Sequence, residues 1–227
     1  MSLKHYFEAY IQIAHDDLEK PFEQDKWRRH IPFAKFIQEK GLVLEVGCGL
    51  GGLASILAKD SMVVGLDLSR KYLHIAKNSL DSSVLGVAEF LPFHREVFDV
   101  AVAECLLEHV ISPEEVVEQI IPTLKSNGVL YVLVPYKEDI SKYQDLHGVK
   151  AHVRVFDDNT INKLFSKYHI VKRNGLGQLY LTCSTFKFLK SVLAKILGKK
   201  RGLLLLDKIH LRLRLVKPPF IALKVKN

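Results

Sequence analysis

The chain has 227 residues, 48% of them hydrophobic, and a formal net charge of +8. This length and apolar content suffice for one α/β domain with additions and give no case for two independent domains. The charge is uneven, because residues 185–227 hold twelve Lys or Arg and one acidic residue, Asp207, while the remaining residues are slightly acidic.

The cysteine count and the terminal sequences exclude several classes of protein. Cys48, Cys105 and Cys183 are too few and too scattered for a disulfide framework or a CxxC metal cluster, so we expect no metal and a reduced, cytoplasmic setting. The N-terminal residues lack the apolar region of a secretory signal. No apolar run approaches the ~18 residues of a transmembrane helix.

The apolar periodicity and the turn residues predict alternating helices and strands. Helices are expected over 3–19 and from Phe22 or Asp25 to Glu39, where Gly41 ends the segment. The elements expected next are strand 42–46, helix 53–59, strand 62–66, helix 70–80 capped by Ser69, strands 84–87 and 98–103, a helix opened by Ser112-Pro113 and ending near 124–126, a turn at Asn127-Gly128, strand 129–134, helix 156–166 and strand 168–173.

This alternation predicts a doubly wound, mostly parallel Rossmann-like sheet. Beyond residue 174 the pattern changes to basic amphipathic helices over about 186–197 and 202–216, followed by the strand FIALKV. We therefore expect an N-terminal helical segment (1–40), an α/β core (41–174), a basic helical insertion (175–217) and a closing strand of the core (218–227).

The stretch LVLEVGCGLGGLA, residues 42–54, is the centre of the predicted site. A buried strand runs into Gly47, Gly49, Gly51 and Gly52, and a helix follows. Glycine permits positive φ and close approach of a ligand. The spacing satisfies both G-x-G-x-x-G and G-x-G-x-G, so it does not separate a nicotinamide or flavin site from another adenosyl cofactor site. Asp67, at the end of the next strand, is placed to accept hydrogen bonds from ribose hydroxyls.

Other polar residues follow the predicted strands directly. Ligands of doubly wound sheets bind outside the carboxyl ends of the strands. The residues expected along that edge are Gly47–Gly51, Asp67, Ala88 with Glu89, Glu104 and Tyr136.

Four motifs in order, LVLEVGCGLGGLA, VVGLDLS, AEFLPFHREVFDVAVAECLLEHV and LKSNGVLYVLVP, resemble those of the class I S-adenosylmethionine-dependent methyltransferases, in particular the small-molecule branch. The resemblance covers about Gly41 to Tyr136. It implies a sheet of about seven strands with an antiparallel last strand, and S-adenosylmethionine as cofactor.

The resemblance also implies a role for each cofactor-binding residue. Glu45 would accept from the cofactor's amino group, and the loop with Gly47, Cys48, Gly49 and Gly51 would approach the methionyl part. Asp67 would accept hydrogen bonds from the ribose, and Leu68 would pack on the adenine face. The Ala88 backbone N–H would donate to the adenine ring, and Glu104 would line the methionyl end. The family often has an Asp that accepts from the adenine amino group where this chain has Val87, and Glu89 would take over that contact.

The expected function is methyl transfer to a small-molecule or lipid-like acceptor. A sulfonium donor is already activated, so alignment supplies much of the rate, and a base is needed only if the acceptor must lose a proton. The candidates for that base are His109, Tyr136 and His152. The alternatives are an RNA methyltransferase, a nicotinamide-dependent oxidoreductase or a cofactor-binding protein without turnover.

The basic segment leaves three interpretations open. It can be a helical cap on the sheet, a surface at 185–217 for an anionic membrane or a lipid-like acceptor, or a nucleic-acid surface, which the sparse aromatic residues favour least. The second interpretation adds peripheral membrane contact to a cytoplasmic location. Oligomeric state is not readable from the sequence.

Overall fold

A seven-stranded sheet dominates the computed structural model, which describes residue 8 and residues 29–142, 145–146, 149–150, 152–176 and 220–226. The strand order is β3-β2-β1-β4-β5-β9-β8. The strands are β1 (Leu42–Val46), β2 (Met62–Asp67), β3 (Ser82–Leu85), β4 (Phe98–Glu104), β5 (Leu124–Pro135), β8 (His169–Leu176) and β9 (Phe220–Lys226), and β6 (Asp145–Leu146) pairs separately with β7 (Val149–Lys150).

The register of the sheet brings the ends of five strands to one edge. β3, β2, β1, β4 and β5 pair in parallel, whereas β9 pairs antiparallel with both β5 and β8. The predicted doubly wound, mostly parallel sheet with an antiparallel last strand is confirmed. The loops that follow the five parallel strands therefore lie at the same edge, here called the carboxyl edge.

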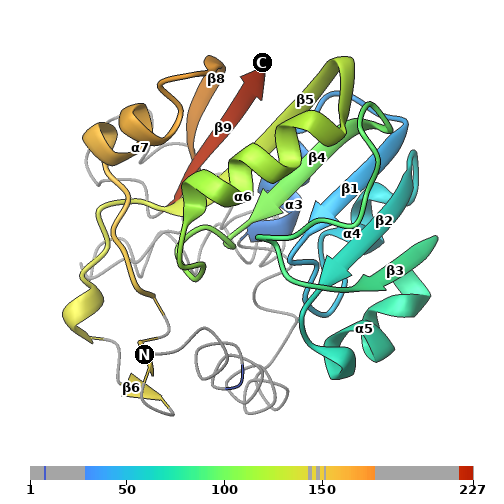
Figure 1. The fold of residues 1–227 in the computed structure, drawn as a ribbon, viewed down its shortest axis with the longest axis horizontal. Helices are drawn as coiled ribbons and strands as arrows, with labels where there is room; N and C mark the ends of the chain where they lie inside the picture. The colour runs from blue at the N-terminus through green and yellow to red at the C-terminus, as the bar shows by residue number, and fades with distance from the viewer. Residues whose placement is uncertain are drawn as a thin grey trace, which may run out of the picture.

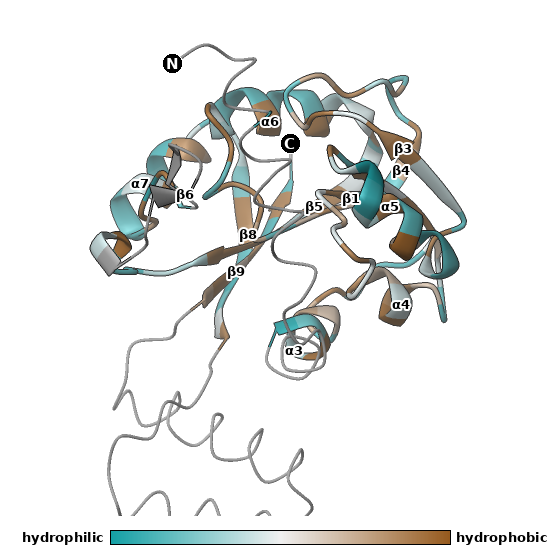
Figure 2. Cartoon of the chain, turned by 90° about the horizontal axis from the view of Figure 1, so that it is seen from below, coloured by the Kyte–Doolittle hydropathy of each residue, from teal (hydrophilic) through white to brown (hydrophobic). Residues whose placement is uncertain are grey.

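Helices cover both faces of the sheet (Figures 1 and 2). One apolar cluster joins the sheet to α6 (Pro113–Ile120) and α7 (Asp158–Leu164), and the other joins it to α3 (Ile31–Ala34) and α4 (Ala54–Leu57). The fifth helix of the sheet region, α5 (Arg70–Ala76), contacts β2 and β3. Short 3-10 turns lie at Lys77–Ser79, Ile121–Thr123 and Ile140–Lys142.

The predicted caps at Ser69 and Ser112 are confirmed, and a third cap starts α7. The Ser69 hydroxyl accepts from the Tyr72 amide at the start of α5, and the Ser112 hydroxyl accepts from the Glu115 amide at the start of α6, where Pro113 occupies the first turn. At α7, Asp157 and Thr160 form a reciprocal capping box. Each cap satisfies an amide that the first helical turn leaves without an intrahelical partner.

Several predicted boundaries are wrong. The helix that starts at Ser112-Pro113 ends at Ile120 and not near 124–126, because Leu124 already begins β5. α3 ends at Ala34 and does not reach Glu39, because the chain turns toward the sheet, where the Gln38 amide donates to the Tyr131 hydroxyl. β3 spans 82–85 and not 84–87, because its pairing starts where the Asp81 carboxylate accepts from the Val63 amide. Asn127-Gly128 lie inside β5, at an irregularity of its pairing with β4 between Phe98 and Val100.

The predicted helices over 186–197 and 202–216 lie outside the described residues, as does the helix over 3–19 except for Glu8, which is helical. Within the described part of the chain, no helix is long and apolar enough to cross a bilayer.

Candidate active site

The glycine loop follows β1 at the carboxyl edge. Gly47, Gly49 and Gly51 have φ values of 73°, 52° and 77°, the left-handed region that favours glycine. A Cβ on Gly47 would lie 2.9 Å from Leu106, and one on Gly51 would lie 3.1 Å from Ala76, whereas one on Gly49 would meet nothing within 4 Å. Of these three glycines, Gly49 is therefore the one that borders open space into which a ligand can approach the backbone.

Asp67, at the end of β2, supports this loop directly. One carboxylate oxygen accepts from the Gly49 amide and the other from the Ser69 amide, each at 2.8 Å. Burial raises the pKa of Asp67, and these backbone donors oppose the shift. A carboxylate offers about four acceptor positions, so Asp67 can support the loop and still accept from a ligand hydroxyl.

Glu45 lies within β1, buried between β2 and β4. Its Oε2 has no hydrogen-bond partner among the described residues. Burial raises its pKa well above the ordinary carboxyl value, and the nearby carboxylates of Glu104 and Asp67 raise it further. A buried acceptor beside two other carboxylates is costly unless a donor or a cation meets it. Glu45 is therefore suited to an ammonium group of a ligand.

Glu104, at the end of β4, has partners that the sequence did not indicate. Its Oε2 lies 2.6 Å from His30 Nδ1, and its Oε1 lies 3.4 Å from Arg29 Nε. His30 packs against the glycine loop, because a Cβ on Gly52 would lie 2.4 Å from its Nε2. Gly52 thus makes room for the imidazole and does not need an unusual φ. No sequence motif marks residues 29 and 30, since they precede β1 in a segment outside the resemblance.

The other predicted cofactor residues occupy the same edge with different surroundings. Ala88 and Glu89 are buried after β3, and burial raises the pKa of Glu89, whose Oε1 has no hydrogen-bond partner in the described part of the chain. Leu68 is partly exposed beside Asp67. Cys48 is buried with its sulfur against Gly65, and burial raises its thiol pKa, which fits a core residue and not a nucleophile.

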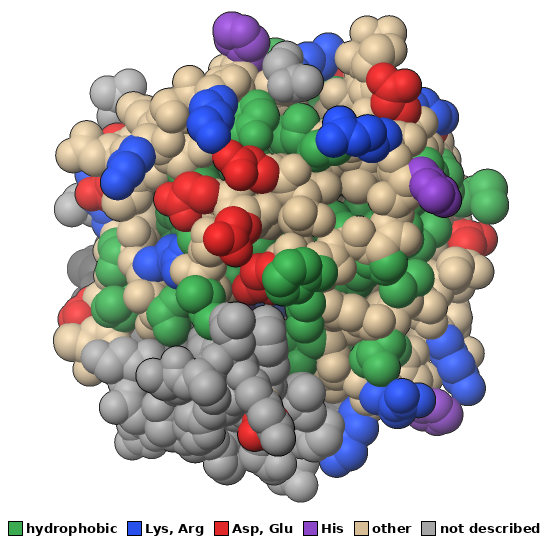
Figure 3. Space-filling view, in the orientation of Figure 1, with side chains coloured by type: hydrophobic (Ala, Val, Ile, Leu, Met, Phe, Trp, Pro, Cys, Tyr) green, Lys and Arg blue, Asp and Glu red, His purple; other side chains and the backbone are tan. Residues whose placement is uncertain are grey.

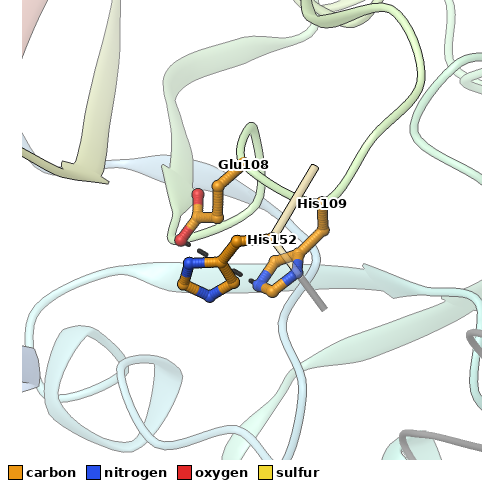
Figure 4. A group of neighbouring side chains, drawn as sticks. All are labelled: Glu108, His109 and His152. Carbon is orange, nitrogen blue, oxygen red and sulfur yellow. Dashed lines mark ion pairs between the residues drawn. The ribbon is translucent and has the colours of Figure 1, made fainter. Parts of the chain in front are cut away.

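Two of the three candidate bases, His109 and His152, lie together, and the third, Tyr136, makes a different contact. His109 and His152 meet edge to face with ring centroids 4.7 Å apart, and the carboxylate of Glu108 lies beside them (Figure 4). Tyr136 instead donates its hydroxyl to Asp158 of α7 at 2.6 Å. We call Glu108, His109 and His152 the histidine cluster. Both histidines were predicted as candidate bases, whereas Glu108, the residue before His109 in the motif AEFLPFHREVFDVAVAECLLEHV, was not predicted.

The arrangement favours a cationic ligand over an anionic one. Glu45, Asp67 and Glu104 gather around the glycine loop, and the helix that follows the loop, α4, has only four residues. A pyrophosphate would need backbone donors at the start of a longer helix and would be repelled by carboxylates. S-adenosylmethionine carries a sulfonium and an ammonium, so these residues fit its methionyl end. The fold and this site define an α/β protein whose glycine loop and buried carboxylates suit a ligand with a positively charged end.

Comparison with known proteins gives the family of this domain. Residues 44–132 match the family model described as a methyltransferase domain. The predicted resemblance to class I S-adenosylmethionine-dependent methyltransferases is thus confirmed, with S-adenosylmethionine as the cofactor of the domain. The model covers the loop, Asp67, Glu89, Glu104 and Glu108, but not His152.

The relatives differ in activity and match only in part. The chain is 33% identical over 96 residues to a ubiquinone biosynthesis O-methyltransferase of Coxiella burnetii, a match that covers 39% of this chain and 41% of the relative. It is 35% identical over 95 residues to a mitochondrial arginine-hydroxylase of mouse, covering 39% of this chain and 27% of the relative. The first curated relatives are therefore matched over about two fifths of their length.

A solved structure resembles the whole fold. A S-adenosylmethionine-dependent methyltransferase from Thermotoga maritima superposes with a TM-score of 0.65 at 17% identity, covering 98% of both chains. At this identity the likeness supports the architecture alone.

Proposed function

We propose that the protein transfers the methyl group of S-adenosylmethionine to a small-molecule or lipid-like acceptor. The observation that carries the proposal is the buried Glu45 carboxylate beside the glycine loop, with Oε2 lacking a partner in the described chain and two further carboxylates nearby. A cofactor with a cationic methionyl end supplies the missing partner. The domain match over 44–132 supports the same assignment.

The chain's contribution to the chemistry is binding and alignment. The sulfonium already makes the methyl group reactive, so an acceptor atom held in line with the carbon–sulfur bond can attack it directly. Glu45 and the loop hold the methionyl end, and Asp67 holds the ribose. The S-adenosylhomocysteine that remains has lost the sulfonium charge, so the carboxylates around the loop retain it less strongly by charge.

Support for a small acceptor comes from the matched ubiquinone biosynthesis O-methyltransferase, whose name implies a small molecule. The segments that would choose the acceptor are residues 1–40 and 137–217, which lie outside the family match. Part of the second range is described here, and it includes His152.

Equilibrium binding tests the cofactor assignment. We expect S-adenosylmethionine and S-adenosylhomocysteine to bind in the micromolar range by calorimetry, and NADH not to bind. Binding of NADH without S-adenosylhomocysteine would refute the proposal and support the oxidoreductase alternative.

Turnover tests the activity, because relatives with this domain include a protein named as a hydroxylase. Methyl-labelled cofactor is incubated with hydroxylated aromatic compounds, lipids or RNA, and transfer of label is counted. Label in a small-molecule or lipid product is the expected result. Label in RNA alone favours the nucleic-acid alternative, and tight binding without transfer to any acceptor favours the binding protein.

The basic segment 185–217 lies outside the described residues, and for it we propose one of the three roles that its sequence leaves open, a contact surface for anionic membranes that keeps a cytoplasmic protein at the bilayer. Its lysines and apolar residues support this proposal. Sedimentation with anionic vesicles should occur and should be lost when Lys190, Lys195, Lys199 and Lys200 are replaced. Salt-sensitive binding of RNA in place of vesicles would contradict the membrane assignment.

A further inference from the structure

Two separate segments of the chain meet at the histidine cluster. Glu108 and His109 follow β4, whereas His152 precedes α7, and Figure 4 shows the three side chains converging. One ligand-type atom of each residue lies within 4.8 Å of the others. This spacing allows one ion to contact all three.

Backbone and guanidinium contacts hold these two segments together. The Val153 amide donates to the Glu108 carbonyl at 3.0 Å. The Arg154 guanidinium donates to the carbonyls of Val110 and Ile111 at 2.5 and 2.8 Å. The positions of Glu108 and His152 are therefore fixed by contacts that do not involve their own side chains.

Glu108 provides an independent sign of a missing ligand. Its side chain is 1% exposed, and neither carboxylate oxygen has a hydrogen-bond partner within the described residues. The nearest ion-pair atom, His109 Nε2, is 3.9 Å away. Burial raises the pKa of Glu108 to about 7, although His152, Arg29 and the Cys105 thiol lie near enough to oppose that shift. A buried carboxylate without a direct hydrogen bond is costly unless a cation is paired with it or coordinated by it.

His152 is oriented as metal-binding histidines commonly are. Its Nδ1 lies 2.5 Å from the carboxylate of Glu138. A carboxylate on one ring nitrogen fixes the tautomer and raises the basicity of the other nitrogen, which then binds the metal.

We propose that Glu108, His109 and His152 bind a divalent transition-metal ion, with Glu138 as the residue that positions His152. Two imidazoles and one carboxylate suit Zn²⁺ or Mn²⁺ better than Ca²⁺, which prefers oxygen ligands alone. No metal was predicted from the three scattered cysteines, and His152 is too far from Glu108 and His109 in the sequence for the three to form a recognisable motif.

Three protein ligands leave an open coordination position, which water or an oxygen of the acceptor can fill. The cluster lies after β4, on the carboxyl edge where the cofactor residues lie. An ion at this place would hold an acceptor hydroxyl and make it easier to deprotonate. This use of the ion, and the hydroxyl-bearing acceptor that it implies, rests on the proposed methyl transfer, whereas the metal site itself does not.

Metal titration of the full chain tests the site without cofactor or acceptor. After treatment with a chelator, calorimetry with Zn²⁺ and with Mn²⁺ should show one site in the wild type. We expect His152→Ala and Glu108→Gln to weaken the binding at least 100-fold, and Glu138→Gln to weaken it about 10- to 100-fold. His74→Ala, which removes an exposed histidine of α5, is the matched control and should bind as the wild type does.

A spectroscopic measurement separates this site from adventitious binding. Co²⁺ in the wild-type site should give visible absorption bands that are absent from His152→Ala, while the unchanged far-UV circular dichroism of that variant shows that it is folded. Equal binding of Zn²⁺ or Mn²⁺ by the wild type and the Glu108→Gln and His152→Ala variants would overturn the proposal, as would no binding by the wild type. Because cofactor binding is measured separately, failure here leaves the proposed methyl transfer standing.

Discussion

The cofactor end of the site and the histidine cluster arise from different parts of the sequence. Every cofactor residue follows a parallel strand or lies within one, and the residues from Glu45 to Glu104 belong to one continuous, family-like stretch. The histidine cluster instead joins a loop after β4 to the segment before α7, through Val153 and Arg154. Strand order alone positions the first group, whereas the second depends on tertiary contacts between distant segments.

The two ends also differ in how their buried charge is balanced. Around the glycine loop, Asp67 accepts from two backbone amides and Glu104 is paired with His30 and Arg29. Among these three carboxylates, Glu45 is the one without an ion pair or hydrogen bond at its Oε2 within the described residues. In the histidine cluster, Glu108 is the corresponding group. Each end therefore has one buried carboxylate suited to a cation, the cofactor's ammonium at one and a metal ion at the other.

The largest expected effect is the loss of cofactor affinity in the Asp67→Ala variant. The variant loses the acceptor of the Gly49 and Ser69 amides as well as the proposed ribose contact. Losing hydrogen bonds to a charged group costs about 1.5 to 3 kcal/mol, which is roughly 10- to 150-fold in cofactor affinity. Calorimetry with S-adenosylhomocysteine measures it, and Asp60→Ala, which removes an exposed carboxylate bound to Lys40, is the control. If the folded Asp67→Ala variant binds S-adenosylhomocysteine as tightly as the wild type does, the ribose assignment is refuted. The variant should still bind Zn²⁺ at the histidine cluster, because Asp67 is not one of the proposed ligands.

Gly52→Ala tests the contact between the glycine loop and His30. The added Cβ would lie 2.4 Å from His30 Nε2, so the imidazole must move and its pairing with Glu104 is disturbed. Overpacking of this kind costs about 1 to 3 kcal/mol of folding free energy, measured by denaturant unfolding. Gly86→Ala, whose nearest neighbour would be a Leu66 carbon at 3.2 Å, should cost less. If the two variants lose the same stability, His30 does not constrain the loop.

Much of the cofactor end could be predicted from the sequence, because its signals are local. β1 was placed correctly by an apolar run that ends in glycine, and Asp67 by its position at the end of the next strand. The caps at Ser69 and Ser112 follow from side-chain chemistry within one helical turn. His30 escaped notice, since nothing in the sequence near it indicates that Gly52 leaves space for an imidazole.

The histidine cluster could be predicted only in part. His109 and His152 were singled out as candidate bases by residue type, but their contact depends on how the segment before α7 packs against the loop after β4. Tyr136 was grouped with them by its place after β5, and its hydroxyl contacts Asp158 instead. Asn127-Gly128 lie within the bounds of β5, but at the irregularity where its pairing with β4 passes from Leu124 to Val129, so the local preference of these two residues shows as a break in the pairing and not as the end of a strand.

The Glu45→Gln variant should be more stable than the wild type without cofactor and should bind the cofactor more weakly. The pKa of Glu45 is raised in the folded protein, chiefly by burial, so the unfolded chain loses this proton at lower pH than the folded one does. The wild type without cofactor therefore loses stability as pH rises above the ordinary value of 4.5, toward the raised folded pKa. The amide cannot ionise, so the variant should be more stable than the wild type at pH 8, with a smaller difference at pH 5.

The same variant should bind S-adenosylmethionine about 10-fold more weakly, because a neutral acceptor replaces a charged one opposite the ammonium. Thermal unfolding at the two pH values and calorimetry measure the two effects. A variant that is less stable at pH 8 than the wild type would contradict the assignment of Glu45 as a costly buried charge. If the affinity of the variant for S-adenosylmethionine is unchanged, Glu45 does not bind the ammonium group of the cofactor.

The smallest expected effect is that of Ser112→Ala, at the helix start that follows the histidine cluster. The substitution removes the acceptor of the Glu115 amide at the start of α6 and should cost about 1 kcal/mol of stability. Ser126→Ala, at an exposed position in β5, should have little effect. The helix packs on the core through Val116, Val117 and Ile120, so the loss should appear in global unfolding by denaturant. Cofactor affinity should remain unchanged, because none of the proposed cofactor-binding residues lies on α6. A large loss of cofactor binding would show that this helix couples the histidine cluster to the cofactor end of the site.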